Sequence, residues 1–260
     1  MRSTILWLIL ISVTLNSYSQ NPVQAKLLKR AYALHSDSLL RVFLNNWSKE
    51  SRLISRATRT KKTNDTLNNL YQVYNAFYKK DRTAFDKYLL LRDNIQYQVI
   101  DSIKPDADVN ERYSRSTLHA LQDSLTKYFD QFKIIEPFYP KLDLSASKVL
   151  LLTKSYHDLL ESFLDTTIET DNYNFNEKTT ERAHNDNKVR FIGKYFDIVG
   201  RHWGHFFDYM SFPEIRQVMF DRTLSRAIIS YELSCKGGVA YLEKMDGKWQ
   251  IVEEGITITQ

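Results

Sequence analysis

All seven glycines of this 260-residue chain lie after residue 190. Glycine adopts positive φ without a steric cost, and tight β-hairpin turns depend on that freedom. The long glycine-free part therefore predicts helices, which need no left-handed position, and the glycine-bearing tail is predicted to hold the hairpins. The expected fold class is α+β, with an N-terminal helical hairpin or bundle followed by a C-terminal helix and a curled antiparallel sheet.

The spacing of apolar residues supports helices in the first half of the chain. Apolar side chains recur mostly three or four residues apart, which is the period of one helix face. Residues with short polar side chains stand where such helices would begin and can cap them. The helices predicted are Pro22 to about Arg56, a second starting at Asn64 or Asp65, a third over Asp81 to Ile103 and a fourth over 108–132.

The middle of the chain changes character. The stretch Ile134 to Pro140 contains two prolines and is predicted to be a linker. A short apolar run follows, and Thr153 can cap a helix that carries one apolar stripe. That stripe consists of Tyr156, Leu159, Leu160, Phe163 and Leu164. Residues 165–188 are polar and are predicted to form a loop or an exposed flap.

The tail carries the clearest strand signals. Arg226 to Cys235 alternates between apolar and polar residues, and Gly237 with Gly238 is expected to turn the chain. Asp246-Gly247 between two alternating runs is a strong hairpin signal. Strands are also predicted over Ile215 to Phe220 and within residues 191–209.

The first twenty residues predict export. Arg2 precedes an apolar stretch from Ile5 to Val13, and small residues at Ser17 and Ser19 fit a cleavage site. The expected parts are a signal peptide over 1–19, a helical region over 20–135 and an α+β cone-like domain over 136–260. The mature protein is expected to be secreted or periplasmic after cleavage near Ser19, and a short uncleaved membrane anchor is the alternative. No later stretch is long and apolar enough to predict a transmembrane span.

Charge and cysteine content limit the partners. Cys235 is the only cysteine, so an internal disulfide and a multi-thiolate zinc module are both excluded. The helical half is basic, and its densest cluster either contacts an acidic surface or is a solvated helix end. That cluster is Arg52, Arg56, Arg59, Lys61 and Lys62. No nucleic-acid motif accompanies it, so the expected partner is a protein or a small-molecule ligand and not a nucleic acid.

The passage from Arg201 to Tyr209 holds the candidate chemistry. On a strand, His202 and His205 point to opposite faces and cannot share one ion, although on a helix they could, and no metal site is expected. No phosphate-cradling loop or dinucleotide fingerprint occurs, and no cofactor is expected. His205 is either an acid–base residue or a core histidine, and its weak catalytic companions are Asp208, Asp197 and Tyr209. Residues expected to line an aromatic ligand site are Trp203, His205, Phe207 and Tyr231. His157, Asp158 and Glu161 form a less specific acid–base group on the capped helix.

Part of the chain resembles known families. The segments Leu152-Thr153-Lys154-Ser155-Tyr156, Phe163-Leu164, His202-Trp203-Gly204, Phe212-Pro213, Ala227, Gly237-Gly238-Val239-Ala240 and Asp246-Gly247-Lys248-Trp249 resemble uncharacterised secreted proteins of the Bacteroidetes type. The likeness covers residues 140–254. The helix followed by a sheet is similar to the cone-shaped α+β superfamily of nuclear transport factor 2 and the cystatins. That superfamily contains enzymes, ligand binders and interaction modules, so the resemblance implies a fold and brings no catalytic residues.

Two functions from different classes follow. The favoured hypothesis is an exported, non-catalytic module that binds a ligand or partner, because no nucleophile elbow, phosphate loop or dinucleotide fingerprint occurs in the sequence. The alternative is a small-molecule hydrolase or isomerase that uses a histidine–carboxylate pair in an aromatic-lined cone. A third, weaker hypothesis gives the basic helices a role at the cell envelope.

Overall fold

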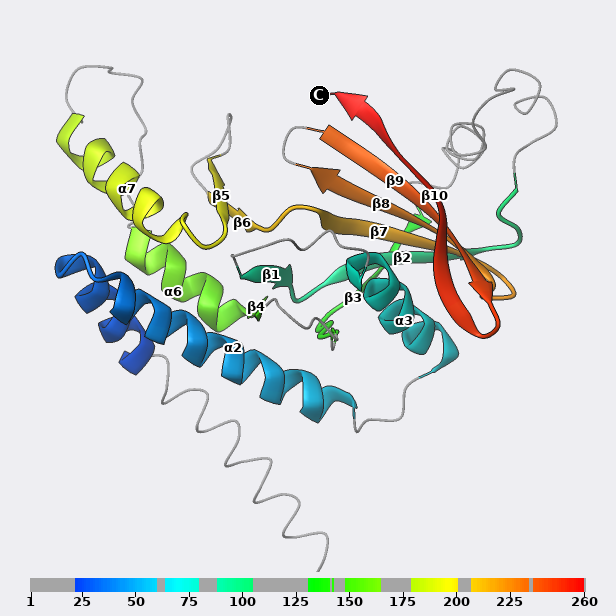
Figure 1. Cartoon of the computed structure of the whole chain (residues 1–260), viewed down its shortest axis with the longest axis horizontal. Coiled ribbons are helices and arrows are strands. Elements are labelled where there is room, and N and C mark those ends of the chain that lie inside the picture. Colours follow the sequence, from blue (N-terminus) through cyan, green and yellow to red (C-terminus); the bar gives the residue numbers. More distant parts are fainter. Residues whose placement is uncertain are drawn as a thin grey trace, which may run out of the picture. The chain divides into compact units, whose positions relative to one another are not determined.

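The computed structural model in Figure 1 is a mixed α+β protein. It describes residues 22–59, 64–79, 88–104, 131–140, 142, 148–164, 179–200, 207–233 and 236–259. The expected signal peptide and most of the predicted fourth helix lie outside these ranges. Within them, no helix combines the length and the apolar character that crossing a membrane requires.

Two compact units alternate along the chain. The first, called the helical unit, takes the chain up to Lys49 together with Leu152–Tyr209. The second, called the sheet unit, takes Glu50–Leu151 together with Met210–Gln260. Each unit therefore consists of two separate segments of sequence. The boundary expected between residues 135 and 136 falls inside the sheet unit.

The helical unit begins with two helices where the sequence predicted one. A helix over residues 22–33 ends before His35, which has a φ of 46°. Helix α2 (Asp37–Arg59) starts two residues later and continues past Lys49 into residues assigned to the sheet unit. Ser36 lies between the two helices, and its Oγ accepts a hydrogen bond from the Leu39 backbone N–H at 3.3 Å. A serine in this position offers the backbone a cap in place of helical continuation, which explains the break.

Helix α6 (Lys154–Leu164) confirms the predicted helix after Thr153, because its buried residues are the predicted apolar stripe. Helix α7 (Thr179–Ile192) shows that the predicted loop is wrong over 179–188. The prediction followed the polar composition of this segment. The C-terminal end of the helix is held by buried residues, among them Lys188 and Phe191. Strands β5 (Asp197–Gly200) and β6 (Phe207–Met210) form a two-stranded sheet. Aromatic side chains fill this unit, and the rings of Trp47 and Tyr156 stack 4.3 Å apart.

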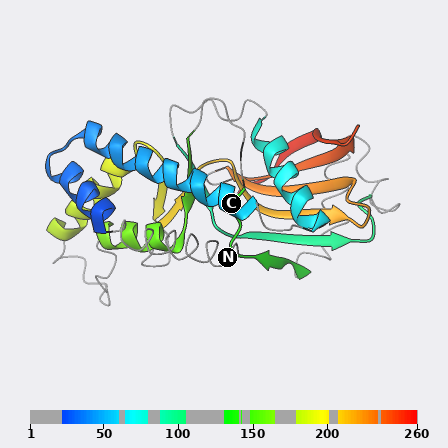
Figure 2. The same cartoon turned by 90° about the horizontal axis from the view of Figure 1, so that it is seen from below.

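The sheet unit contains a six-stranded sheet in the order β10-β9-β8-β7-β2-β3. Strands β7 to β10 form an antiparallel meander, β2 runs parallel to β7, and β3 lies at the edge beside β2 (Figure 2). A separate pair joins β1 to β4. The strands are β1 (Leu89–Arg92), β2 (Ile95–Ile100), β3 (Lys133–Ile135), β4 (Val149–Leu152), β7 (Glu214–Asp221), β8 (Arg226–Leu233), β9 (Lys236–Met245) and β10 (Lys248–Thr259).

The prediction of a third helix up to Ile103 is therefore wrong over residues 88–104, where β1 and β2 lie. The predicted linker likewise begins with β3, followed by a cis Glu136-Pro137 bond. None of these strands pairs with its immediate successor through a tight glycine turn. Glycine-free sequence consequently did not exclude strands, because their partners lie far away in the chain.

Helix α3 (Asp65–Lys79) covers one face of the sheet (Figure 1, Figure 2). The Asn64 Oδ1 accepts a hydrogen bond from the Leu67 backbone N–H at 2.8 Å, which confirms the predicted cap. Between the helix and the sheet lies a packed core with fully buried side chains from both, including Phe77, Val218 and Phe220. At about 25 cal/mol per Å² of apolar surface, burial of this kind supplies most of the stabilisation of such a unit.

The predicted antiparallel sheet in the tail is confirmed, with one correction at its glycines. Asp246 and Gly247 both have positive φ and join β9 to β10 as expected. Gly237 and Gly238, in contrast, lie inside β9 and not in a turn. A Cβ on Gly238 would overlap the ring of Tyr231 on the neighbouring strand β8, so the glycine permits close packing of that ring.

Candidate functional site

The candidate residues that the structure describes fall in both units. Trp203 and His205 lie outside the described residues. Phe207 and Asp208 belong to β6, where only their backbone is described, and Asp197 begins the neighbouring strand β5. Tyr209 lies in the helical unit and Tyr231 in the sheet unit, so the candidate tyrosines belong to different units.

Tyr209 contacts the acid–base group of helix α6. Its hydroxyl donates a hydrogen bond to Glu161 Oε1 at 2.6 Å, and the His157 ring lies edge-on to the Tyr209 ring at 5.7 Å. His157 Nε2 is 4.0 Å from the same Glu161 oxygen, which is longer than a hydrogen bond. Burial, together with the hydrogen bond to Glu161 and its charge, raises the pKa of Tyr209. The phenol is therefore held neutral as a donor and cannot act as a base near neutral pH.

Tyr231 lies within the packed core of the sheet unit. Its side chain is buried, its ring lies 5.0 Å from the ring of Phe77, and its hydroxyl donates to Glu254 Oε1 at 2.6 Å. The ring also covers Gly238, as described above. The space between α3 and the sheet at this point is thus occupied by the protein's own side chains.

Strand β7 begins at a closed cluster of charges. Glu214 is 4% exposed, and its Oε1 lies 2.6 Å from Arg92 Nε. Arg216 lies 3.5 Å from the other oxygen of Glu214 and bonds Glu232 Oε2 at 2.5 Å. Burial raises the pKa of Glu214, although the charges of Arg92 and Arg216 oppose that shift. The arginines are held by carboxylates, so the cluster is a structural ion-pair network.

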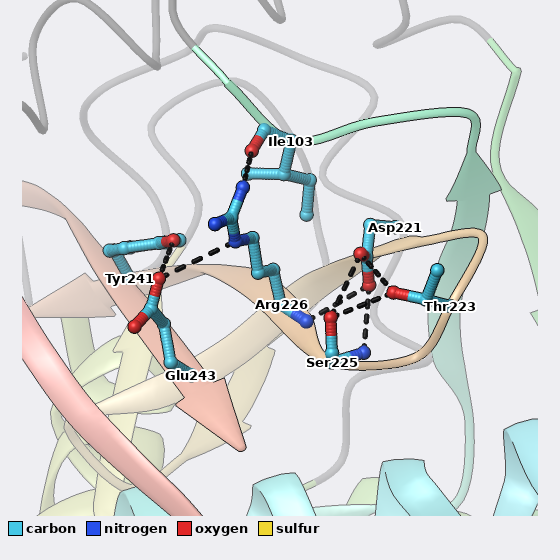
Figure 3. Close-up of polar contacts among 7 residues, drawn as sticks. All are labelled: Ile103, Asp221, Thr223, Ser225, Arg226, Tyr241 and Glu243. Atoms are coloured by element: carbon cyan, nitrogen blue, oxygen red, sulfur yellow. Dashed lines mark hydrogen bonds and ion pairs between the residues drawn. The ribbon is translucent and has the colours of Figure 1, made fainter. Parts of the chain in front are cut away.

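The other end of β7 forms an ordered turn around Asp221 (Figure 3). Asp221 Oδ1 accepts hydrogen bonds from the backbone N–H groups of Ser225 at 2.8 Å and Arg226 at 2.9 Å. Its Oδ2 accepts from the hydroxyls of Thr223 at 2.5 Å and Ser225 at 3.1 Å. Burial alone would raise the pKa of Asp221, but the hydrogen bonds from Thr223, Arg226 and Ser225 outweigh it and lower the pKa.

Arg226 ties this turn to the rest of the sheet (Figure 3). Its guanidinium donates to the Ile103 carbonyl oxygen at 3.4 Å and lies 3.4 Å from Glu243 Oε1. The Tyr241 hydroxyl donates to the same carboxylate oxygen of Glu243 at 2.5 Å. Burial, with the hydrogen bond and charge of Glu243, raises the pKa of Tyr241. The turn is therefore braced by contacts to β9 and to the segment after β2.

A polar groove of about 480 Å³ lies beside this turn, within the sheet unit. Nearly all of its side chains are amides, hydroxyls or charged groups. We call it the polar groove, and its lining residues are Asp65, Asn68, Asn69, Gln72, Thr223, Leu224, Ser225, Lys244 and Gly247. It brings together the first half of α3, the β7–β8 turn and the β9–β10 hairpin.

Asn69 organises the floor of the polar groove. It is 6% exposed, and its Oδ1 accepts hydrogen bonds from Lys244 Nζ and Trp249 Nε1, both at 3.0 Å. Its Nδ2 donates to the Asp65 carbonyl oxygen at 2.8 Å. These contacts connect α3 to the last hairpin across about 180 residues of sequence. This site was not predicted from the sequence. The signal that could have indicated it is Asn69, a polar residue at a buried position of an amphipathic helix.

Comparison of the chain with protein-family models, curated proteins and solved structures finds no match. Among the described residues, no three histidine, cysteine or acidic side chains gather as a metal site would require.

Proposed function

We propose that this protein is an exported, non-catalytic binding module and that the polar groove of its sheet unit takes a small ligand. The observation that carries the proposal is the groove itself, whose volume of about 480 Å³ lies within the range of about 300–1,000 Å³ common for small-molecule sites. Its lining comes from three separate segments that the fold brings together. The space between α3 and the sheet is filled by the packed core, whereas the polar groove is open.

The resemblance to the cone-shaped α+β superfamily belongs to the same proposal. The feature in its favour is a helix packed on a largely antiparallel sheet. That helix is α3, which precedes residues 140–254 that carry the likeness, whereas the expected helix, α6, belongs to the helical unit. The parallel pairing of β2 with β7 and the interleaved second unit are features particular to this chain. Because the superfamily contains many functions, the proposal depends on the groove and not on the fold.

Screening the full chain by thermal shift against sugars, amino acids, nucleotides and organic acids tests the binding function. A ligand present at about 100 times its dissociation constant stabilises the folded state by about 2.7 kcal/mol, which raises the melting temperature measurably. Gln72→Ala should reduce the shift, because the exposed Gln72 side chain lines the groove. Gln250→Ala is the matched control, since Gln250 is exposed and lies outside the groove. A shift of the same size in Gln72→Ala and in the unaltered protein would place the ligand elsewhere.

Export is proposed on the N-terminal sequence alone. Mass spectrometry of the mature protein, expressed with its first nineteen residues in a bacterial host, should give an N-terminus near Gln20. An intact N-terminus in the membrane fraction would support the uncleaved anchor.

The basic cluster with Arg52 and Arg56, both exposed on α2, is proposed to contact an acidic surface. Binding to anionic vesicles that disappears with added salt would support that contact.

The alternative function is a small-molecule hydrolase or isomerase in the helical unit. The observation in its favour is Tyr209, whose hydroxyl bonds Glu161 beside the half-exposed His157. Its strand also pairs with the strand of Asp197. Turnover of an ester or lactone panel that falls at least about tenfold in Glu161→Gln, with no change in Lys154→Ala, would establish this function. Lys154 is the control because its exposed ion pair with Asp158 lies on the same helix.

A further inference from the structure

We infer that the polar groove binds an uncharged polyhydroxylated ligand, a mono- or disaccharide. The inference rests on the proposed binding function and adds the chemical class of the ligand. It follows from the donors, acceptors and charges that the lining residues present.

The β7–β8 turn offers hydrogen-bond acceptors to the groove. Thr223 and Ser225 each have one hydroxyl proton, and their oxygens lie 2.7 Å apart. Both hydroxyls also contact Asp221 Oδ2, which accepts and cannot donate. In every arrangement of these contacts, the two protons remain inside the turn. The remaining lone pairs of Thr223 and Ser225 can therefore only accept hydrogen bonds, and a matching ligand must supply the donor groups.

The charges of the groove oppose a charged ligand. Lys244 and Asp65 line it together, so their formal charges cancel. An anion near Lys244 would also meet the Asp65 carboxylate and the acceptor oxygens of the turn. A cation near Asp65 would meet the Lys244 ammonium, which is held in place by Asn69. Neutral ligands avoid both repulsions and the loss of hydration that a charge suffers on binding.

Helix α3 adds groups that both donate and accept. Gln72 is exposed on the groove side of the helix, and its amide carries two donor hydrogens and an acceptor oxygen. A sugar hydroxyl donates one hydrogen bond and accepts others, so adjacent hydroxyls match an amide on one side and a hydroxyl oxygen on the other. The single apolar lining side chain, Leu224, can contact the C–H face of a sugar ring.

The walls of the groove are fixed before any ligand arrives. Four hydrogen bonds to Asp221 hold the turn, and three hydrogen bonds hold Asn69 between α3 and the last hairpin. A preorganised site loses little conformational entropy on binding. The groove is open and polar, however, so the expected dissociation constant is modest, about 0.1–1 mM.

Titration calorimetry of the full chain tests the ligand class with matched probes. Glucose, maltose and N-acetylglucosamine are the neutral probes, glucose 6-phosphate is the anionic one and glucosamine is the cationic one. At least one neutral sugar should bind, and the anionic and cationic probes should bind about tenfold more weakly or not at all. Failure of all three neutral sugars to bind at about 10 mM overturns the inference.

Variants connect the sugar to the groove. Gln72→Ala and Thr223→Val should each weaken sugar binding about tenfold, through a lost amide and a lost acceptor oxygen. Gln250→Ala should leave it unchanged. Thr223→Val also removes one hydrogen bond to Asp221, so the unfolding midpoint of each variant is measured as well. If Thr223→Val lowers that midpoint, the assignment depends on Gln72→Ala alone.

The outcomes separate this inference from the binding function it depends on. If a ligand of another class binds and Gln72→Ala abolishes that binding, the groove is a binding site and the saccharide assignment is wrong. If no ligand of any class binds in a Gln72-dependent manner, the proposed binding function of the groove fails. Equal affinity for glucose and glucose 6-phosphate would contradict the charge argument.

Discussion

Strand β7 carries a carboxylate at each end, and the two side chains have opposite surroundings. Glu214 at the start is paired with arginines and has a raised pKa, whereas Asp221 at the end accepts hydrogen bonds from its own turn and has a lowered pKa. The Glu214 end is a closed ion-pair network, and the Asp221 end holds two hydroxyls at the edge of the polar groove. At Glu214 burial outweighs the opposing arginine charges, whereas at Asp221 the hydrogen bonds of the turn outweigh burial. The balance between burial and partners therefore sets the direction of each pKa shift.

Removal of the Glu214 carboxylate should have the largest effect. In Glu214→Ala, Arg92 and Arg216 lose a shared partner, and the free energy of unfolding should fall by about 3 kcal/mol in urea denaturation. Glu214→Gln keeps the shape without the charge and should lose less. A loss under about 1 kcal/mol in Glu214→Ala would show that the arginines are satisfied without it.

Removal of the Asp221 carboxylate should cost about 2 kcal/mol, because several hydrogen bonds to one charged acceptor are lost together. The same variant, Asp221→Ala, should abolish ligand binding, while Glu214→Ala should leave binding intact at temperatures where it is folded. Asp221→Asn retains one acceptor oxygen and should recover part of both properties. If Glu214→Ala lost ligand binding while its circular dichroism spectrum remained that of the folded protein, the Glu214 end of β7 would also contribute to binding.

The pH dependence of stability should differ in sign at the two ends, with smaller effects than deletion. Glu214 has a raised pKa, so its contribution declines as pH rises from the usual glutamate value of about 4.3 through the folded pKa. Asp221 has a lowered pKa, so its contribution is complete above about 3.9 and is lost as pH falls through the folded value. Urea denaturation across pH 3–7 should show these opposite slopes as differences from Glu214→Gln and Asp221→Asn. Equal slopes would contradict the assignment.

The smallest effect is expected for an exposed ion pair near Asp221. Arg222 and Asp101 lie 3.6 Å apart, and their side chains are 80% and 92% exposed. Arg222→Ala should change the free energy of unfolding by no more than about 0.3 kcal/mol, because solvent screens such pairs. A clearly larger change would mean that even an exposed ion pair near the turn contributes to the free energy of unfolding.

Local signals allowed several elements to be predicted from the sequence. The Asn64 cap, the apolar stripe of α6 and the Asp246-Gly247 hairpin each depend on a few neighbouring residues, and the structure confirms all three. In each case the residues that determine the conformation are within one turn or one hairpin of each other. Such elements are encoded where they form.

The elements that could not be predicted depend on distant partners. Residues Ile95, Tyr97 and Val99 alternate as a strand, yet the absence of glycine favoured a helix, because glycine content bears on tight hairpins and not on pairing between distant strands. Strand β2 in fact pairs in parallel with β7, whose sequence lies far downstream. The polar groove was missed for the same reason, since Asn69 meets Lys244 and Trp249 only after the whole sheet has formed.

The alternating use of the chain by two units has a consequence for biosynthesis. Helix α3 and strand β2 emerge from the ribosome long before β7 to β10, so their apolar faces have no sheet to cover them until the C-terminal segment arrives. A fragment that stops before residue 210 would expose these faces and should aggregate. Under the export proposed above, late completion of the sheet would leave the sheet unit unfolded while the polypeptide passes through a translocation channel.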